Sequence, residues 1–336
     1  METNLNFFQT SATKTPTDEI FILARKVKEL NAINHPPRLT GFKKITSENM
    51  PAVWEFLKNE KGRTTDFSYA GVLMWVNYFN YEYAIYRNTL FIKGVVENDM
   101  SKPAFSLPIG ELPLDESMKI LREYCDANNI ELEFSAIPEY AVEELRKFNP
   151  RYVEELTDWG DYLYEAEPLA TLQGKKMSKK RNHVHQFLAA YPNWEAREMT
   201  PDNADDAMMF MDVFDQEGDS TDMAKAERDL SRELIGHLKS GDKHLKGMIL
   251  YVDGKVAAYT IGDVKGNTLF VHVEKATRSV NGSYEMINYL FAKKITEENP
   301  EILYINREDD SGDIGLRMAK ESYHPKEILK KYNILF

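Results

Sequence analysis

The sequence has almost no cysteine and no long apolar run. Cys125 is the only cysteine among 336 residues, which excludes an intramolecular disulfide and a zinc site rich in thiolates. No stretch approaches the run of about 18 apolar residues that a transmembrane helix needs. The N-terminal residues lack a basic segment followed by an apolar one, so they do not resemble a secretory signal. We therefore expect a cytoplasmic protein, and peripheral contact with a membrane stays open.

Positive charge is also scarce. The chain has 42 Lys and Arg against 54 Asp and Glu, and its formal net charge is -12 at pH 7. Such a protein is generally repelled by nucleic acids and anionic lipids, unless it carries a local basic patch. Apolar and aromatic residues are abundant, with 43% hydrophobic residues, 18 Tyr and 17 Phe. This composition indicates packed cores rather than disorder, and the length suits two domains.

The pattern of predicted elements occurs twice. Each half is predicted as strand, two helices, three antiparallel strands, helix, strand, helix and strand. We expect an α/β (α+β) fold of two tandem domains, each a mixed, mostly antiparallel sheet flanked by helices. The expected divisions are an N-terminal arm with a short helix (1–40), a structural first domain (41–167), a basic linker helix (168–190) and a second domain with the active site (191–336).

The most informative stretch is LYINREDDSGDIGLRMAKESYHP, residues 303–325. A short apolar strand ends in a polar loop, and a helix follows that stops before Pro325. Ligands of α/β proteins commonly bind where a strand ends before a helix. The alternative is a solvated acidic loop, and the spacing does not separate the two. The corresponding strand of the first half closes with Ser135, Ala136, Ile137 and Pro138, which have no charge, so we expect that half to be structural.

The order of elements resembles the GNAT acyltransferase fold, and the second half carries the closer likeness. Together with residues 304–325, three short motifs resemble the phosphatidylglycerol lysyltransferase C-terminal domain family: Leu172-x-Gly174-Lys175, Arg181-Asn182 and Gly282-Ser283-Tyr284. Asn306 and Tyr323 loosely match an asparagine and an aromatic residue of the GNAT pattern. The resemblance covers residues 41–336 and implies two GNAT-like domains in tandem.

The resemblance implies a transferase. It would move an aminoacyl group, with aminoacyl-tRNA as the donor, to an amine or hydroxyl acceptor in the cleft between the domains. A lipid headgroup or a peptide would be such an acceptor, although the sequence shows no multi-span membrane half like that of the lipid-modifying relatives. Two alternatives stay open: an N-acetyltransferase that uses acyl-coenzyme A, and a non-catalytic GNAT-fold protein that binds an amino acid, a peptide or RNA. The coenzyme A signature is not intact, because Arg278 and Gly282 stand at the wrong spacing.

Acyl transfer needs a polarised carbonyl, a base and a group that holds the leaving group. The resemblance predicts that backbone N–H groups polarise the carbonyl where the strands ending at Glu274 and Ile305 part, and we expect the largest cavity there. A carboxylate can serve as the base if burial raises its pKa. The candidate catalytic residues are Glu274, Asn306, Glu308, Asp309 and Tyr323. Helix capping and packing are the structural alternatives for these side chains.

Five further residues are candidates for substrate binding: Arg307, His272, Tyr284, Gly282 and Ser283. The guanidinium of Arg307 could bind a phosphate or carboxylate, or it could pair with an acidic neighbour in the loop. The turn at residues 282–283 could present N–H groups to a phosphate, or it could be an ordinary helix N-cap. His272 shares a strand face with Glu274, although histidines there are more commonly packed in a core.

The most basic stretch contains five candidates for polyanion binding: Lys175, Lys176, Lys179, Lys180 and Arg181. Contacts with the phosphates of tRNA would make such binding sensitive to salt. The alternative is a solvated helix face that balances acidic surface. No cofactor is predicted beyond acyl-coenzyme A or aminoacyl-tRNA as a donor substrate. No metal site is predicted, because the acidic loop at residues 308–313 does not have EF-hand spacing.

Overall fold

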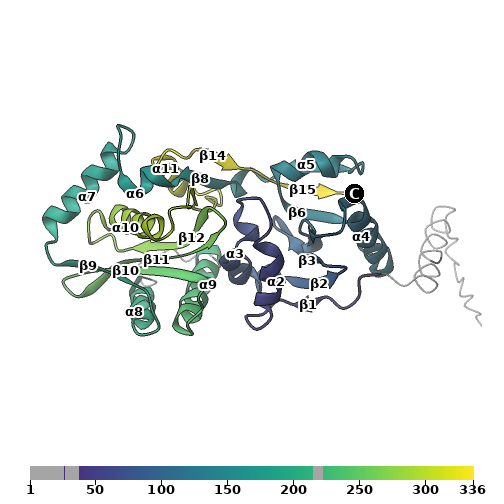
Figure 1. Ribbon diagram of the computed structural model, residues 1–336, viewed down its shortest axis with the longest axis horizontal. Helices are drawn as coiled ribbons and strands as arrows, with labels where there is room; N and C mark the ends of the chain where they lie inside the picture. Colours follow the sequence, from purple (N-terminus) through teal and green to yellow (C-terminus); the bar gives the residue numbers. More distant parts are fainter. Residues whose placement is uncertain (1–25, 27–37, 215–221) are drawn as a thin grey trace, which may run out of the picture.

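The structure is a computed structural model that describes residue 26 and residues 38–214 and 222–336. The helix expected at residues 18–30 lies outside the described residues, except for residue 26. The described chain forms two mixed β-sheets, which lie side by side along the long axis of the molecule (Figure 1). None of the helices in these ranges combines the length and the apolar character that crossing a bilayer would require.

The first sheet has the strand order β1-β2-β3-β4-β6-β15-β7, and β5 pairs with β3. Its strands are β1 (Lys43–Lys44), β2 (Glu82–Tyr86), β3 (Thr89–Val96), β4 (Asp99–Phe105), β5 (Ile109–Gly110), β6 (Glu133–Pro138), β7 (Tyr152–Glu155) and β15 (Lys331–Leu335). The helical elements of this half are α2 (Met50–Leu57), η1 (Thr65–Phe67), α3 (Tyr69–Trp75), α4 (Leu114–Asn128), α5 (Glu139–Arg146) and η2 (Thr157–Trp159).

The second sheet has the strand order β14-β8-β13-β12-β11-β10-β9. Its strands are β8 (Asp161–Glu165), β9 (Trp194–Glu198), β10 (Leu245–Val252), β11 (Lys255–Lys265), β12 (Thr268–Ala276), β13 (Tyr304–Asn306) and β14 (Glu327–Leu329). The helices are α6 (Ala166–Thr171), α7 (Ser178–Ala190), α8 (Ala204–Phe214), α9 (Asp222–Lys239), α10 (Ser283–Glu298) and α11 (Ile314–Glu321). Helices α6, α7 and α10 cover one face of this sheet, and α8 and α9 cover the other (Figure 1).

The main predicted helices and strands form in the expected order, with β5, α6 and β14 as additional elements, but two strands lie in the opposite sheet from the one expected. Strand β8 was placed in the first domain, yet it pairs with β13 and β14 of the second sheet. Strand β15 was expected to end the second domain, yet it lies between β6 and β7 of the first sheet. Both strands have only five residues, and their local pattern does not reveal which sheet they join. The expected boundary at residues 167 and 168 therefore does not separate the two sheets. The second sheet contains β8 from before it, and the first sheet contains β15 from after it.

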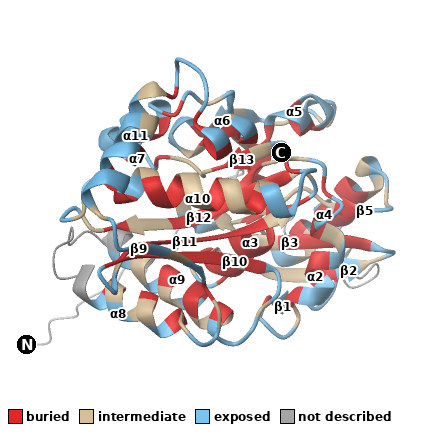
Figure 2. Cartoon of the chain, turned by 60° about the vertical axis from the view of Figure 1, so that its left-hand side comes forward, coloured by how far each residue is buried: buried red, intermediate tan, exposed pale blue. Residues whose placement is uncertain are grey.

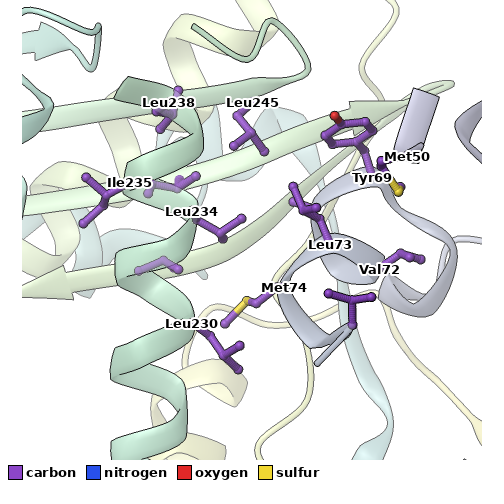
Figure 3. Packing of buried hydrophobic residues seen from close by; sticks show 14 of the residues in the cluster. Met50, Tyr69, Val72, Leu73, Met74, Leu230, Leu234, Ile235, Leu238 and Leu245 are labelled. Atoms are coloured by element: carbon purple, nitrogen blue, oxygen red, sulfur yellow. The ribbon is translucent and has the colours of Figure 1, made fainter. Parts of the chain in front are cut away.

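A hydrophobic core continues from one half of the molecule into the other. Leu73 and Met74 of α3 belong to the same cluster as Leu230 and Leu234 of α9 (Figure 3). The colouring by burial shows α3 and the centre of β10 and β11 as buried segments (Figure 2). Apolar burial contributes roughly 25 cal/mol per Å², so this shared cluster holds the two halves together and limits their relative motion.

Candidate active site

The second sheet opens at the end of β13. Strand β12 runs parallel to β13, and their pairing ends at Phe270 opposite Asn306. Strand β12 then continues to Ala276, while the chain after Asn306 turns toward α11. The segment of β12 from Val271 to Glu274 therefore lies beside an opening in the sheet, as the resemblance to GNAT proteins predicted.

A cavity of about 740 Å³ lies at this opening, between the two halves. The second half contributes His272, Glu274, Tyr284, Arg307, Glu308, Asp309 and Tyr323 to its lining. The first half contributes Asp66, Trp75, Phe79, Tyr81 and Glu97, and Lys331 comes from β15. The cavity lies between the two halves, where the sequence placed it, but the charged residues that the first half contributes were not identified from the sequence.

His272 joins two carboxylates beneath the cavity. Its Nε2 atom lies 2.5 Å from Asp263 Oδ1, and its Nδ1 atom lies 2.7 Å from Glu308 Oε1. Asp263 also accepts hydrogen bonds from the backbone N–H groups of Tyr69 and Ala70, at the start of α3. Burial opposes the imidazolium charge, but the hydrogen bonds to Asp263 and Glu308 outweigh it and raise the pKa of His272 to about 10. His272 is therefore a buried cation that ties the site to the first half.

We expect the protonation of His272 to make folding stability depend on pH. The folded state holds this proton more tightly than the unfolded chain, in which the pKa is about 6.5. The stabilisation is therefore complete below about pH 6.5 and is lost as the pH rises through about 10. Urea unfolding across this range should show a falling free energy of unfolding in the wild type. The fall should be much shallower in His272→Gln, and equal slopes in the two proteins would contradict the assignment.

Asn306 positions the loop and does not line the cavity. Its amide nitrogen donates to Arg63 O at 2.6 Å and to Asp161 Oδ2 at 2.9 Å, and its Oδ1 accepts from Glu308 N at 2.7 Å. The last of these bonds closes a turn in which the Asn306 side chain accepts from the N–H two residues later. Within this turn Glu308 has a left-handed φ of 58°. The expectation that Asn306 is catalytic is therefore revised, because its buried amide directs Glu308 toward His272.

Lys320 holds the same loop from the side of α11. It is buried, and its Nζ atom donates to the carbonyl oxygens of Arg307, at 2.6 Å, and of Asp309. Burial lowers the pKa of Lys320 and raises that of Glu308. The sequence pattern identified Lys320 only as part of a helix. Its one signal was its position on the face of α11 that turns inward.

Arg307 and Glu274 form one pair on the cavity wall. Arg307 Nη2 donates to Glu274 Oε1 at 2.8 Å, and Asn288 donates to the other carboxylate oxygen at 3.0 Å. The guanidinium carbon lies 4.7 Å from the ring centroid of Tyr323. Arg307 Nη1 is buried and has no hydrogen-bond partner within the described ranges. Glu274 is thus occupied as a counterion, while Arg307 keeps one nitrogen for a ligand.

The rest of the acidic loop stabilises the fold. Asp310 accepts from Arg317 and from Tyr162, and these hydrogen bonds lower the pKa of Asp310 to about 2. Asp313 caps α11 by accepting from Leu316 N at 2.6 Å. Asp309 accepts from Ser311 but still lines the cavity. The solvated-loop alternative therefore fits the exposed Asp313, whereas Asp310 is buried in an ion pair with Arg317 and Glu308 lines the cavity.

Gly282 and Ser283 do not reach the cavity, although both were candidates for substrate binding. A Cβ atom at residue 282 would lie 3.0 Å from His183 O, which shows that α10 starts close against α7. Ser283 is buried and donates to Thr277 O. Gly282 is the N-cap residue of α10, and Ser283 is the first residue of that helix, whereas Tyr284 does line the cavity.

The five residues of the basic stretch occupy four different environments. Lys180 lines the main cavity, and its Nζ atom lies 3.9 Å from the ring centroid of Tyr323. Lys175 and Lys176 line a neighbouring cavity of about 410 Å³, to which Tyr323 also contributes. Lys179 is exposed. Arg181 donates to the carbonyl oxygens of residues 172 and 174 and closes the turn before α7, so its guanidinium serves the fold.

The first half supplies charges to the cavity that the sequence pattern did not reveal. Lys331 Nζ lies 3.0 Å from Asp66 Oδ2 and 2.9 Å from Asp161 Oδ1. Glu97 enters from the turn between β3 and β4. The turns before α3 and after β3 therefore contribute charged side chains to the same cavity as Arg307, while the structural role expected for this half stays a prediction. Within residues 38–214 and 222–336, no cluster of His, Cys, Asp and Glu is arranged to hold a metal ion.

Comparisons with known proteins agree with this architecture. A family model described as phosphatidylglycerol lysyltransferase, C-terminal, matches residues 59–335. A conserved protein of unknown function from Bacteroides thetaiotaomicron is 31% identical, over 89% of this chain and 100% of that chain, with a TM-score of 0.80. L-PGS from Bacillus licheniformis is 13% identical over 88% of this chain and 94% of that one, with a TM-score of 0.61. FemX is 9% identical over 88% and 98%, with a TM-score of 0.60. The last two show a shared fold.

Proposed function

Since this chain belongs to the phosphatidylglycerol lysyltransferase C-terminal family, we propose that it is an aminoacyltransferase that takes its aminoacyl group from aminoacyl-tRNA. The acceptor would be an amine or hydroxyl group, carried by a lipid headgroup or a peptide, in the cavity between the two halves. One observation carries this proposal. The cavity lies where β12 and β13 part, and it is lined by Arg307, which has one nitrogen without a hydrogen-bond partner in the described residues, and by Glu308.

The donor ester would lie along the free edge of β12. Beyond Phe270 this strand has left its pairing with β13, so we assign polarisation of the ester carbonyl to backbone N–H groups there. Arg307 Nη1 would donate to an oxygen of the donor, because it is the nitrogen that the pair with Glu274 leaves unused. A hydrogen bond of this kind is strongest in a site that excludes water.

Glu308 would take the proton of the attacking group. Burial raises the pKa of Glu308, although its hydrogen bond with His272 opposes the rise. A carboxylate whose pKa is raised toward the working pH is a more effective base than an exposed one. Tyr323, with Lys180 beside its ring, would stand near the leaving ribose oxygen. A cytoplasmic location, where aminoacyl-tRNA is available, belongs to the same proposal.

The basic side chains beside the two cavities would bind the tRNA. Lys175, Lys176 and Lys179 are exposed, and Tyr323 lies between their cavity and the main one. We expect the triple charge reversal of these lysines to glutamate to weaken tRNA binding. We also expect the salt dependence to become shallower by about one unit of slope for each phosphate that the protein no longer neutralises. Filter binding over a range of salt concentrations measures both, and Lys119→Glu, an exposed site on α4, is the matched control.

The function itself is tested by incubating the chain with mixed aminoacyl-tRNAs and with amine and hydroxyl acceptors. New amide or ester products identified by mass spectrometry support the proposal. Stabilisation by an acyl-coenzyme A thioester, together with no binding of tRNA, would instead establish the acetyltransferase alternative. Binding of amino acids or RNA without any product would establish the non-catalytic one.

A further inference from the structure

The carboxylate of Glu97 is held in the cavity without a partner. The Glu97 backbone N–H donates to Ser135 Oγ at 3.1 Å, and that hydroxyl donates to Asn333 Oδ1 at 2.7 Å. These bonds fix the turn between β3 and β4 from two neighbouring strands. Glu97 Oε2 is shielded from solvent and has no hydrogen-bond partner in the described part of the chain. A buried carboxylate oxygen without a partner is costly, and a ligand cation at this place would remove the cost.

Glu97 lies near other carboxyl groups and a lysine. Asp66, Asp161 and Asp309 lie close enough to raise the pKa of Glu97, after the larger effect of burial, and Lys331 opposes them. The ammonium of Lys331 is already divided between Asp66 and Asp161. The ammonium of Lys331 therefore serves several carboxyl groups at once, and a cation supplied by a ligand would stabilise the charged form of Glu97.

Aromatic rings line the same cavity. Trp75, Phe79 and Tyr81 all contribute to its lining, and burial together with the nearby Glu97 carboxylate raises the pKa of Tyr81. The ring centroids of Trp75 and Phe79 are 5.6 Å apart, and those of Phe79 and Tyr81 are 5.7 Å apart. Aromatic faces attract cations and also pack against alkyl chains. A carboxylate beside a group of rings suits an alkyl chain that ends in an ammonium group.

We propose that the Glu97 wall is the acceptor subsite, and that the acceptor is a primary amine on an alkyl chain. This inference rests on the proposed function. The groups assigned to the donor, namely the edge of β12, Arg307 and Glu308, all belong to the second half, whereas Glu97 and the rings belong to the first. An amine held on the Glu97 wall faces the donor carbonyl from across the cavity, where a nucleophile must stand.

The reaction balances without a further reactant. The ammonium gives one proton to the Glu97 carboxylate and becomes a free amine. Its nitrogen forms a bond with the ester carbon of the aminoacyl group, and the bond from that carbon to the ribose oxygen breaks. The second proton passes from the nitrogen to the leaving ribose oxygen through Glu308. The products are an amide and tRNA with a free hydroxyl, and Glu97 returns its proton to solvent.

Two ligands that differ only in charge test the subsite without a donor. Isothermal titration calorimetry of the full chain with pentylamine and with pentanol compares an ammonium and a hydroxyl on the same alkyl chain. We expect pentylamine to bind at least about tenfold more tightly, because the hydrogen bond to the carboxylate is assisted by charge. Glu97→Gln should abolish this preference. Glu227→Gln, which removes a carboxylate of the same cavity that is paired with Lys275, should keep it.

Equal affinities of the wild type for the two ligands overturn the inference, and this arm requires no variant to fold. A preference that survives in Glu97→Gln also overturns it. The inference is also overturned if lysine amide binds and pentylamine does not. The ammonium that the cavity recognises would then be that of the aminoacyl group carried by the donor. Transfer to hydroxyl acceptors, with no preference for pentylamine over pentanol, would contradict the amine subsite but still support the proposed function. A preference for pentylamine without any transfer from aminoacyl-tRNA would support the subsite but contradict the proposed function.

Discussion

Replacement of Lys331 by methionine is expected to lower the free energy of unfolding by about 3–5 kcal/mol, the usual cost of leaving a buried charge unpaired. The Lys331 side chain is 2% exposed and lies between Asp66 and Asp161. Methionine fills a similar volume, so packing is largely preserved. Two carboxylates would then remain between the halves without their counterion. Urea unfolding followed by circular dichroism at neutral pH measures the change.

The neighbouring lysine provides the control. Lys330 is 44% exposed and pairs with Glu155 at the surface, so Lys330→Met should change the free energy of unfolding by less than about 1 kcal/mol. Addition of Asp66→Asn to Lys331→Met should recover part of the loss, because one of the two unpaired charges is removed. Similar losses for the two lysine variants would show that the buried network does not contribute in this way.

Replacement of Arg307 by glutamine is expected to lower kcat/KM for aminoacyl transfer by about 10²–10³-fold, the usual effect of removing one donor from a preorganised site. The guanidinium pairs with Glu274 and packs on Tyr323, and its Nη1 atom is the donor left for a ligand. Glutamine cannot supply the charge or reach both positions. Steady-state transfer with a saturating acceptor measures the effect as a change in kcat/KM for the donor.

A second variant separates the loss of the Arg307 hydrogen-bond donor from structural damage to the cavity wall. Arg307→Gln leaves Glu274 without its counterion, so we combine it with Glu274→Gln. The double variant should regain stability without regaining activity. Arg197→Gln, at an exposed pair on β9, should leave turnover unchanged. Full turnover of Arg307→Gln would remove the guanidinium from the mechanism.

Much of the fold follows from local sequence patterns. The strand, loop and helix at residues 303–325 depend on neighbours in the chain, and the structure forms these elements where they were expected. The positions of Glu308 and Arg307 on the cavity wall follow from the same local reasoning. Asn306 was also singled out, but its spacing does not reveal whether its amide meets a ligand or the backbone of Arg63.

The remaining features depend on contacts between residues that are distant in the chain. Nothing near Lys331 indicates that it meets Asp66, and nothing near Glu97 indicates a cavity. The exchange of β8 and β15 is of the same kind, because the local pattern of a five-residue strand does not reveal which sheet it joins. Contacts between distant segments of the chain decide these features. The residues that the first half contributes to the cavity could therefore be identified only from the structure.

The position of β15 also constrains the order in which the protein forms during synthesis. This strand fills the gap between β6 and β7 of the first sheet, but the ribosome makes it after every strand of the second sheet. The nascent first half must therefore wait with two strand edges open, which exposes it to mispairing and to chaperones. We expect the two halves to mature together, late in translation, rather than one after the other.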